Sequence, residues 1–521
     1  MRLGIDFGTT RTVIAYADRG NYPLVSFTDD QGEVIEWFPS VVAEREGELR
    51  FGFEALEASR EAGWTVMRSF KRLLSGGRAT VNGGVQLGGT WVGVIELMAG
   101  FLSALRRALV ERSNLPAGAI KKGEPIEAVV AAPANAFGTQ RFLTLEAFRR
   151  AGFEVRAMLN EPSAAGFEYT HRYRKTLTAR REYVVVYDLG GGTFDASLVK
   201  MSGRHHDAIV TAGINQLGGD DFDAKLAEMA LAEAGLLGEK LPRRAILRLL
   251  DRCREAKEQL NPNSKKIVID LEDVLGDEAP EPEVIVSAQA YYEACTPLVE
   301  RTIEAMMPVI QRLDGEVPRD LDEDAMADVA GIYVVGGASA LPVIGRVLRA
   351  KFGRRVHRSP YPHGATAIGL AIASDDEAGF EMSDRFSRNF GVFREAQGGT
   401  QVAYDAIFTR EMPLPRGHER PHEFKRVYRP AHNVGHFRFF ECSAFDENGT
   451  PRGEIAPVSE VYFAFDPALR AMPNLAKVPV ERMKGTSPAI EEKYSVDRHG
   501  IVKVTITDLE SGYERAFQLG A

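Results

Sequence analysis

The chain has 521 residues, more than one hydrophobic core usually holds, so we expect two to four domains. Its apolar content of 44% and charged content of 26% are ordinary for a soluble globular protein, and a net charge of −9 without a long basic run argues against nucleic acid as the main partner. No stretch approaches 18 consecutive apolar residues, which predicts no membrane span, and the widely spaced Cys253, Cys295 and Cys442 predict a reducing, cytoplasmic setting.

The first predicted elements are two strands joined by a glycine turn. Residues 4–10, "GIDFGTT", form an apolar run that ends in Asp before the turn, and residues 12–17 return as a second β-like run. Apolar residues then recur at spacings of three and four over 95–109, which predicts a helix with one buried face. Residues 126–133 are typical of a buried strand, and Glu161 stands just before the next helical stretch. This part of the chain therefore has α/β composition.

The same strand and turn pattern returns in the second half of this region. Residues 186–195, "VYDLGGGTFD", again place an Asp and a glycine turn before a Thr, and residues 195–201 supply the returning strand. Helical patterns follow over 223–237 and 243–260. The repeated pattern predicts an internal duplication within one α/β domain, which we place at residues 1–374.

A second domain follows an acidic, moderately polar linker at residues 375–388. Helical periodicity is lost there, and short alternating strands with turn signals take its place, as in "EVYFAFD" at 460–466. Residues 491–519 are typical of a three-strand meander. We therefore expect an all-β sandwich domain over residues 389–521.

Each copy of the repeat is suited to holding phosphate. A strand delivers Asp6 or Asp188 to the end of a sheet where ligands of α/β folds bind. Glycines follow because backbone N–H groups must approach phosphate oxygens without a Cβ in the way. The β-like run after each turn excludes the P-loop, in which GxxxxGK[ST] opens a helix. Two facing hairpins would hold a polyphosphate from both sides, and their carboxylates would hold the hydrated cation that bridges the phosphates.

Further residues stand where such a clamp needs them. Glu161 precedes a helix, where its carboxylate can order an attacking water. Gly218 and Gly219 precede another helix, whose N-terminus is an anion site. Lys71 lies between apolar neighbours in "RSFKRLL", and residues 333–342, "YVVGGASALP", would pack against a nucleoside. Together these residues favour a nucleotide triphosphate as the ligand.

These stretches resemble the seventy-kilodalton heat-shock chaperone (Hsp70) family, whose nucleotide domain has a two-lobed, actin-like fold built from duplicated ribonuclease H-like units. The matching motifs are "GIDFGTTRT", "VYDLGGGTFD", "LGGDDFD", and "AVVAAPANAFGTQR" followed by "LNEPSAA". The C-terminal "EEKYSVDRHGIVKVTITDLESG" is similar to the last strands of the family's peptide-binding β-sandwich. The resemblance implies ATP and ADP with Mg²⁺ as ligands, K⁺ as a second cation, and unfolded or extended apolar polypeptide as the partner.

The resemblance also implies a role for individual residues. The implied hydrolytic set is Asp6, Lys71, Glu161, Asp188 and Thr193. Lys71 would stabilise charge on the γ-phosphate, and Glu161 with Asp188 would orient water. Metal-associated waters would be held by Asp6, Asp188 and Asp195. The implied nucleotide contacts are Gly8, Thr9, Thr10, Arg11, Gly190, Gly191, Gly192, Thr193, Gly218, Gly219, Asp220, Lys257, Asn261, Gly336, Gly337, Ala338 and Ala340.

The adenine side departs from the family's pattern. Lys257 matches a ribose-binding lysine, but Arg254 stands where Glu is usual and Glu258 where Arg is usual. Ala338 replaces a Ser, and Ala340 replaces an Arg whose plane stacks on the base. We therefore expect a loosely held base and weak discrimination between ATP and GTP.

Other positions concern the coupling between domains. Pro133 and Arg141 match positions that the family uses to relay nucleotide state, whereas His363 falls where an Asp is usual. The family's linker is rich in leucine, unlike residues 375–388, and its helical lid should follow the β domain. The sequence instead ends at Ala521 directly after the last strand, so the resemblance predicts a lidless domain that releases peptide quickly.

Three functions are compatible with these features. The first is an Hsp70-like chaperone that hydrolyses ATP with low turnover, assisted by co-chaperones or a nucleotide-exchange factor. The second is a nucleotide-gated scaffold with weak or no ATPase activity, which the altered adenine side favours. The third is a small-molecule kinase, because such kinases share the actin-like fold, although the all-β domain has no role there.

Overall fold

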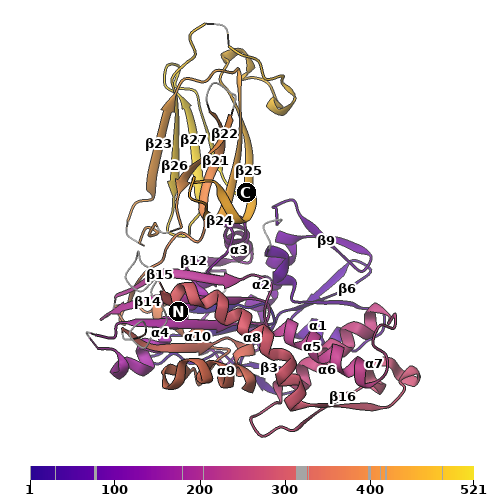
Figure 1. The fold of residues 1–521 in the computed structure, drawn as a ribbon. Coiled ribbons are helices and arrows are strands. Elements are labelled where there is room, and N and C mark those ends of the chain that lie inside the picture. Colours follow the sequence, from indigo (N-terminus) through magenta and orange to yellow (C-terminus); the bar gives the residue numbers. More distant parts are fainter. Residues whose placement is uncertain are drawn as a thin grey trace.

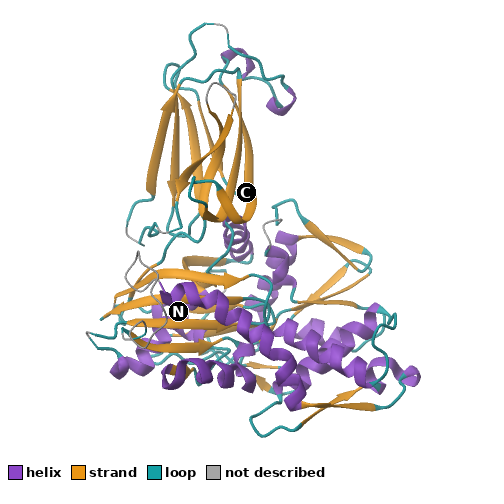
Figure 2. Cartoon of the chain, viewed as in Figure 1, coloured by secondary structure: helices purple, strands orange, loops and turns teal. Residues whose placement is uncertain are grey.

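The computed structural model describes residues 2–29, 31–75, 79–121, 123–178, 180–203, 205–311, 326, 328–396, 401–410, 412–416, 419–483 and 485–520. Ala521, where the sequence ends, lies outside these ranges. Figure 1 shows a body of mixed helices and strands, with an elongated unit of strands standing on it. Figure 2 shows that the long helices lie in the body. The α/β and all-β parts predicted from the sequence are therefore both present.

The first lobe of the body is built on a five-stranded sheet. Its strands lie in the order β12 (Phe153–Asn160), β11 (Ile126–Ala132), β1 (Leu3–Phe7), β2 (Arg11–Tyr16) and β5 (Phe38–Pro39). β11 pairs in parallel with β1 and β12, whereas β1 and β2 form an antiparallel hairpin. Helices cover both faces, which explains why the parallel strands are apolar throughout. The covering helices are α2 (Val94–Glu111) and α3 (Gly138–Arg150) on one face, and α4 (Glu161–Tyr173) and α10 (Ala365–Ser374) on the other.

Two glycines allow α10 to approach its neighbours closely. An added Cβ at Gly4 on β1 would come within 2.3 Å of the Ala371 nitrogen, and one at Gly369 on α10 within 1.8 Å of the Ala164 carbonyl oxygen. Both positions therefore require the absence of a side chain. This packing joins β1 to α4, the helix that begins at Glu161.

The second lobe repeats the arrangement in a six-stranded sheet. Its strands lie in the order β19 (Val356–Arg358), β18 (Val329–Val335), β13 (Tyr183–Leu189), β14 (Phe194–Ser202), β15 (His205–Ile214) and β20 (Glu381–Ser383). The packed helices are α5 (Gly219–Glu233), α6 (Arg243–Glu258), α8 (Ala288–Gln311) and α9 (Pro342–Phe352). β13 forms a hairpin with β14 and pairs in parallel with β18, just as β1 does with β2 and β11. This correspondence confirms the predicted two-lobed, duplicated fold.

Each lobe carries a smaller extension. The first-lobe extension contains β3 (Phe27–Thr28), β4 (Val34–Ile35), β6 (Val41–Arg45), β7 (Glu48–Phe51), α1 (Phe53–Ala58), β8 (Thr65–Arg68), the 3₁₀ turn η1 (Phe70–Leu74), β9 (Gly84–Leu87) and β10 (Thr90–Gly93). The second-lobe extension contains β16 (Lys266–Asp270), α7 (Glu272–Leu275) and β17 (Glu283–Ser287). η1 places Lys71 next to the cleft between the lobes.

The unit that stands on the body is a β-sandwich. One sheet has the order β22 (Gln401–Phe408), β21 (Asn389–Ala396), β24 (Val434–Phe445) and β25 (Pro451–Ala464). The other has the order β23 (His422–Tyr428), β26 (Ile490–Val496), β27 (Val502–Asp508) and β28 (Glu514–Gln518). Apolar side chains from both sheets, including Phe439, Phe463 and Val504, form its core. β26 to β28 are the predicted meander, whereas β24 and β25, with 12 and 14 residues, are longer than the short strands expected.

Residues 375–388 join the body to the sandwich. α10 ends at Ser374 and β21 begins at Asn389, and β20 between them pairs in parallel with β15. The division of the chain at 374 and 389 stays a prediction. In the part of the chain that the structure describes, no helix is both long and apolar enough to pass through a membrane. The three cysteines are buried and free.

Candidate functional site

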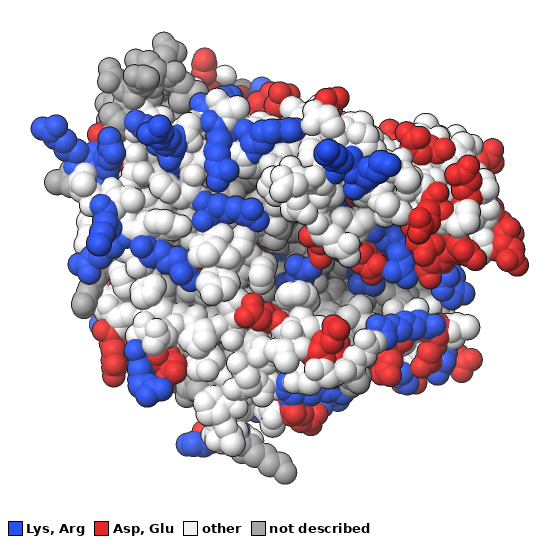
Figure 3. Space-filling view, turned by 90° about the horizontal axis from the view of Figure 1, so that it is seen from below, with Lys and Arg blue, Asp and Glu red and all other residues white. Residues whose placement is uncertain are grey.

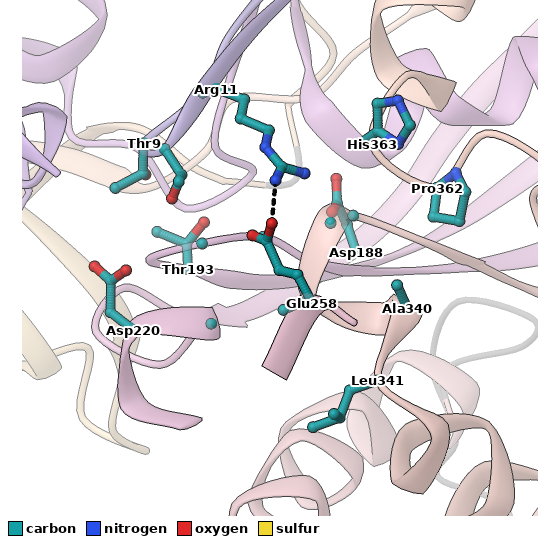
Figure 4. A pocket seen from close by; sticks show the side chains of 18 of the residues that line it. Thr9, Arg11, Asp188, Thr193, Asp220, Glu258, Ala340, Leu341, Pro362 and His363 are labelled. Atoms are coloured by element: carbon teal, nitrogen blue, oxygen red, sulfur yellow. Dashed lines mark hydrogen bonds and ion pairs between the residues drawn. The ribbon is translucent and has the colours of Figure 1, made fainter. Parts of the chain in front are cut away.

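A cavity of about 660 Å³ lies between the two lobes, and Figure 4 shows side chains from both lobes around it. It gathers most of the residues predicted from the sequence. Those that line it are Asp6, Gly8, Thr9, Thr10, Arg11, Lys71, Glu161, Asp188, Gly190, Gly191, Thr193, Gly219, Asp220, Lys257, Asn261, Gly336, Gly337, Ala338 and Ala340. A volume of this size is typical of small-molecule sites.

Three predicted residues lie behind the lining. Gly192 and Gly218 pack against each other, since an added Cβ at Gly218 would come within 2.5 Å of the Gly192 nitrogen. Asp195 faces Asp188 across the β13–β14 hairpin and is 2% exposed. Their predicted contacts with nucleotide or metal would have to pass through neighbouring groups or water.

The two glycine turns contact each other across the cleft, as the repeat predicts. An added Cβ at Gly191 would come within 2.2 Å of Thr10 Oγ1, so the second turn fits against the first only without a side chain. The Gly190 N–H closes the second turn by donating to the Thr193 carbonyl at 3.0 Å. Gly336 has a φ of 85°, and its Cβ would lie 2.4 Å from Asp188 Oδ1. The loop after β18 therefore meets the second turn at its carboxylate.

Carboxylates and one lysine crowd the inner end of the cavity. Lys71 Nζ donates to Glu161 Oε1 at 3.0 Å, and both side chains are largely buried. Glu161 is the first residue of α4, and Lys71 lies in η1 beside the buried Phe70. The Ala134 N–H donates to Asp195 Oδ1 at 3.1 Å. Lys71 and Glu161 are thus brought together as the predicted hydrolytic set requires.

Burial and mutual repulsion of the carboxylates favour the binding of a cation at this end of the cavity. Burial, followed by the charge of Glu161, raises the pKa of Asp6 to about 7 and that of Asp195 to about 8. Burial and the charges of Glu161 and Asp6 also raise the pKa of Asp188 well above its usual range. Burial alone would lower the pKa of Lys71, but Glu161 and Asp6 leave it raised. A bound cation would stabilise the ionised forms of these carboxylates.

The donor set fits a hydrated magnesium ion rather than one held by protein ligands alone. Among the described residues, no three His, Cys, Asp or Glu side chains are grouped to hold a metal directly. Mg²⁺ usually keeps several waters and is held by one or two carboxylates together with phosphates. Asp6 and Asp188 both line the cavity and could contact such waters. The role of Asp195 and the K⁺ site stay predictions.

The segment "LGGDDFD" connects the second turn to α5. The Gly219 and Asp220 N–H groups donate to the Gly190 and Gly191 carbonyls at 2.9 and 2.8 Å. The Gly218 N–H donates to Asp221 Oδ2 at 2.8 Å. These bonds fix the first turn of α5 against the glycine turn, but they also use N–H groups that an anion would need. The predicted anion site at this helix end therefore has few free donors.

On the adenine side, Lys257 and Arg254 of the second lobe are paired within that lobe. Lys257 Nζ lies 2.5 Å from Asp223 Oδ1 and donates to the Gly219 carbonyl at 2.9 Å. Arg254 pairs with Asp220 at 3.0 Å and with Asp223 at 3.1 Å. Arg254, which departs from the family's pattern, is thus a positioning partner for Asp220 and Asp223 of α5.

Several lining residues were missed by the sequence interpretation. These are Trp37, Gln140, Arg358 and Pro362. Trp37 reaches the cavity because Phe38 and Pro39 pair with β2, with Arg11 opposite Pro39. That pairing joins segments about 28 residues apart and leaves no periodic signal in the sequence.

The two predicted relay positions lie between the cavity and the sandwich. Pro133 lines the cavity. Arg141 is 2% exposed and donates through Nη1 to Asn160 Oδ1 at 3.1 Å, next to Glu161. Its Nε donates to the His499 carbonyl of the sandwich at 2.7 Å. Contacts therefore run from the β26–β27 turn to the residue that precedes α4, whereas the relay itself stays a prediction.

Comparisons with known proteins agree with this geometry. Residues 114–385, about half of the chain, match the family model described as Hsp70 protein. The chain is 33% identical over 395 residues to the chaperone protein HscA homolog of Burkholderia multivorans (strain ATCC 17616 / 249), a match that covers 73% of this chain and 59% of that protein. The HscA homologs of Burkholderia cenocepacia and Burkholderia pseudomallei (strain 668) are 32% identical over 395 and 398 residues, with the same shares covered. The match thus spans about three fifths of the length of these curated relatives.

Proposed function

The chain belongs to the Hsp70 family, and we propose that it is a molecular chaperone that binds and hydrolyses ATP to regulate its hold on unfolded or extended polypeptide. One observation carries the proposal. The cavity places two glycine turns face to face around the buried Lys71–Glu161 pair, and Asp6 and Asp188 line the same space. Glycine turns suit phosphates, and the carboxylates suit the cation that accompanies them.

In this proposal, the residues at the inner end of the cavity have separate roles in ATP hydrolysis. Bound magnesium would neutralise charge on the phosphates. Lys71 lies where its ammonium can stabilise charge that develops on the terminal phosphate. Glu161 accepts a hydrogen bond from Lys71, which fixes its carboxylate so that the second oxygen is left to orient a water. Thr193, at the turn of the second hairpin, contributes a hydroxyl donor to the same space.

The β-sandwich supplies the polypeptide site in this proposal. Its two sheets have edge strands β22 and β25, and β23 and β28, whose backbone groups can pair with an extended segment. The contacts from His499 to Arg141 and from Glu441 to the Gly138 N–H connect it to the first lobe. Co-chaperones or an exchange factor would act on the same nucleotide cycle.

A second function, a nucleotide-gated scaffold with little turnover, is favoured by the adenine side. Ala338 and Ala340 line the cavity without a side chain that can stack on or hydrogen-bond to a base. A protein that binds nucleotide loosely and hydrolyses it slowly could use the ligand to set its conformation alone.

One experiment separates these functions. ATP affinity by calorimetry and phosphate release are measured with Mg²⁺, with and without a reduced, unfolded polypeptide. The chaperone predicts slow phosphate release that the polypeptide alters. Nucleotide binding without phosphate release would favour the scaffold, and phosphate transfer to an added metabolite would favour a kinase. No nucleotide binding would contradict the proposal.

A further inference from the structure

An ion pair joins the two lobes across the cavity (Figure 4). Arg11 is the first residue of β2 in the first lobe, and Glu258 is the last residue of α6 in the second. Arg11 Nη2 donates to Glu258 Oε2, and both side chains line the cavity. In Figure 4 the pair lies between Thr193 on one side and His363 on the other. The contact therefore joins the two lobes at the cavity in which a nucleotide would bind.

Aromatic side chains hold Arg11 in place. The Arg11 guanidinium carbon lies 4.2 Å from the centroid of the Trp37 ring, within the range of a cation–π interaction. Trp37 in turn meets the edge of His363, with ring centroids 5.8 Å apart and an angle of 82°. Burial, then the charge of Arg11, lowers the pKa of His363, so its imidazole stays neutral near pH 7 and does not repel Arg11. The Arg11 side chain is 25% exposed, so Trp37 shields much of it from solvent.

Two cations of the second lobe that line the cavity are paired within that lobe. Lys257 and Arg254 both pair with Asp223 inside the second lobe. Ala340 offers no group to stack on a base. Among the described residues that line the cavity, Arg11 is the cation whose carboxylate partner belongs to the opposite lobe. Arg11 and Trp37 of the first lobe can therefore supply the contacts to a nucleoside that the second lobe lacks.

We propose that Arg11, Trp37 and Glu258 form a clasp that closes over the nucleoside and limits nucleotide release. This inference rests on the proposed function, because the clasp acts on a nucleotide in the cavity. Release requires the lobes to separate, and separation breaks the Arg11–Glu258 pair. Glu258, at a position where the family usually has Arg, thus makes a contact between the two lobes. The polyphosphate, held by the glycine turns, does not depend on the clasp.

The direct test is the dissociation rate of tritiated ADP. The bound label is measured by rapid filtration at intervals after excess unlabelled ADP is added. The variants are Arg11→Gln, Glu258→Gln and the double variant. Each is expected to release ADP about three to ten times faster than the natural chain, since a partly exposed pair with a cation–π contact has this strength. The double variant should match Arg11→Gln, because that single variant has already lost both the ion pair and the contact with Trp37. Raising the salt concentration to about 1 M should have a similar effect on the natural chain.

Two further variants test whether faster ADP release comes from loss of the Arg11–Glu258 pair or from a general disturbance of the fold. Arg11→Glu combined with Glu258→Arg restores the ion pair but not the contact with Trp37, so it should slow release relative to either single charge reversal. Arg252, on the same helix as Glu258, pairs with Glu255 of α6 and Asp273 of α7, both in the second lobe, so Arg252→Gln should release ADP at the natural rate. Release at the natural rate from Arg11→Gln and Glu258→Gln would overturn the clasp.

The binding of inorganic pyrophosphate with Mg²⁺ distinguishes a failure of the clasp from a failure of the proposed function. The Arg11 and Glu258 variants should bind pyrophosphate as the natural chain does, because this ligand has no nucleoside. If the natural chain binds neither ADP nor pyrophosphate, both the proposed function and the clasp are wrong. If the variants weaken pyrophosphate as much as ADP, the pair shapes the phosphate site and the clasp is wrong.

Discussion

Lys71 and Glu161, 90 residues apart in the chain, meet as a buried ion pair at 3.0 Å. Asp6, Asp188 and Asp195 lie near this pair, and burial together with the charge of Glu161 raises the pKa of each. A buried cluster of like charges lowers the stability of the empty protein and is offset when a cation binds. The same residues therefore link stability to ligand binding.

This link predicts the pH dependence of stability. Because the pKa of Asp195 rises from an ordinary 3.8 to about 8 on folding, the folded state binds a proton that the unfolded state loses. The free energy of unfolding of the nucleotide-free protein should fall as pH rises from about 4 to about 8, and then level off. Asp195→Asn should flatten this curve, whereas Asp277→Asn, at an exposed position, should not. Urea titrations at several pH values give the measurement, and an unchanged slope in Asp195→Asn would show that Asp195 is ionised in the folded protein.

The adenine side gives a second prediction at the residue scale. Ala340→Arg supplies the stacking cation that the family has at this position, and a cation–π contact contributes about 0.5–2 kcal/mol. The variant should bind ATP about two- to thirtyfold more tightly and favour it over GTP. Ala338→Ser, which adds a hydroxyl without a stacking plane, is the matched control. Calorimetry that shows tight, selective ATP binding in the natural chain and no gain in Ala340→Arg would mean that the base is held in another way.

At the scale of elements, both hairpins and some helices of the body could be predicted, whereas α5 begins at Gly219 and ends at Glu233, four residues earlier than the expected 223–237, and the contacts between elements could not be predicted. The sequence indicated both hairpins, because apolar runs that end in Asp and glycine are local signals, and β1–β2 and β13–β14 confirm them. Helix α2 was expected over 95–109 and extends over Val94–Glu111. Strands β24 and β25 were underestimated, because aromatic residues on both faces of "FRFFECSAF" hide the alternation. The Arg11–Glu258 pair was missed since it depends on how the lobes close.

The two sheets of the sandwich are also joined by buried charge. Arg394 on β21 donates through Nη1 and Nη2 to both Glu492 oxygens, at 3.0 and 2.6 Å, and Glu492 on β26 is fully buried. Arg394 Nε also donates to Asp405 Oδ2 on β22 at 2.8 Å. The pair fixes one sheet against the other at a place where the core is polar.

Removal of Glu492 should destabilise the sandwich strongly. Glu492→Ala leaves the Arg394 guanidinium partly buried without its main partner, and such changes cost about 3–5 kcal/mol. Glu491→Ala, on the same strand, removes a pair with the half-exposed Lys425 and should cost less than about 1 kcal/mol. Urea unfolding followed by near-ultraviolet circular dichroism compares the two. Equal losses in both variants would show that the Arg394–Glu492 pair does not support the fold.

At the scale of the whole molecule, the linker lies directly against the start of α4, and the sandwich contacts the start of α3. Asp384 accepts hydrogen bonds from the Asn160 N–H and from Ser163 Oγ, each at 2.8 Å, and so ties the linker to the start of the helix that begins at Glu161. Arg388 is 1% exposed, lies 3.9 Å over the Phe137 ring and donates to Glu454 at 3.1 Å. Motion of the linker would therefore act on Asn160, one residue before Glu161.

Charge is divided across the underside of the molecule. Figure 3 shows Lys and Arg gathered over one part of this face and Asp and Glu over the other end. The acidic end is where β16, α7 and β17 lie in Figure 1, and residues 270–283 there expose Glu272, Asp277 and Glu278 among others. A long polyanion laid across this face would meet like charge, in keeping with the net charge of −9.

The Asp384 contacts at the start of α4 predict an effect of the linker on how the cleft responds to polypeptide bound by the sandwich. Asp384→Ala removes both bonds at the start of α4, and a buried donor left without its acceptor costs about 1–3 kcal/mol. Phosphate release in the variant should respond less to added unfolded polypeptide than in the natural chain. Asp376→Ala, which removes an exposed linker carboxylate paired with Arg2, is the control and should respond normally. An undiminished response in Asp384→Ala would mean that the linker carboxylate does not couple the sandwich to the cleft.

The central claim is that the cleft between the two hairpins hydrolyses ATP through Lys71 and Glu161. Single-turnover phosphate release from Mg²⁺ and ATP, compared between the natural chain and Lys71→Ala, tests it most directly. The Lys71→Ala variant should bind ATP with similar affinity but release phosphate about 10²–10³ times more slowly, as expected when one preorganised charge is removed from the transition state. Phosphate release at the natural rate in a variant that still binds ATP would contradict the account.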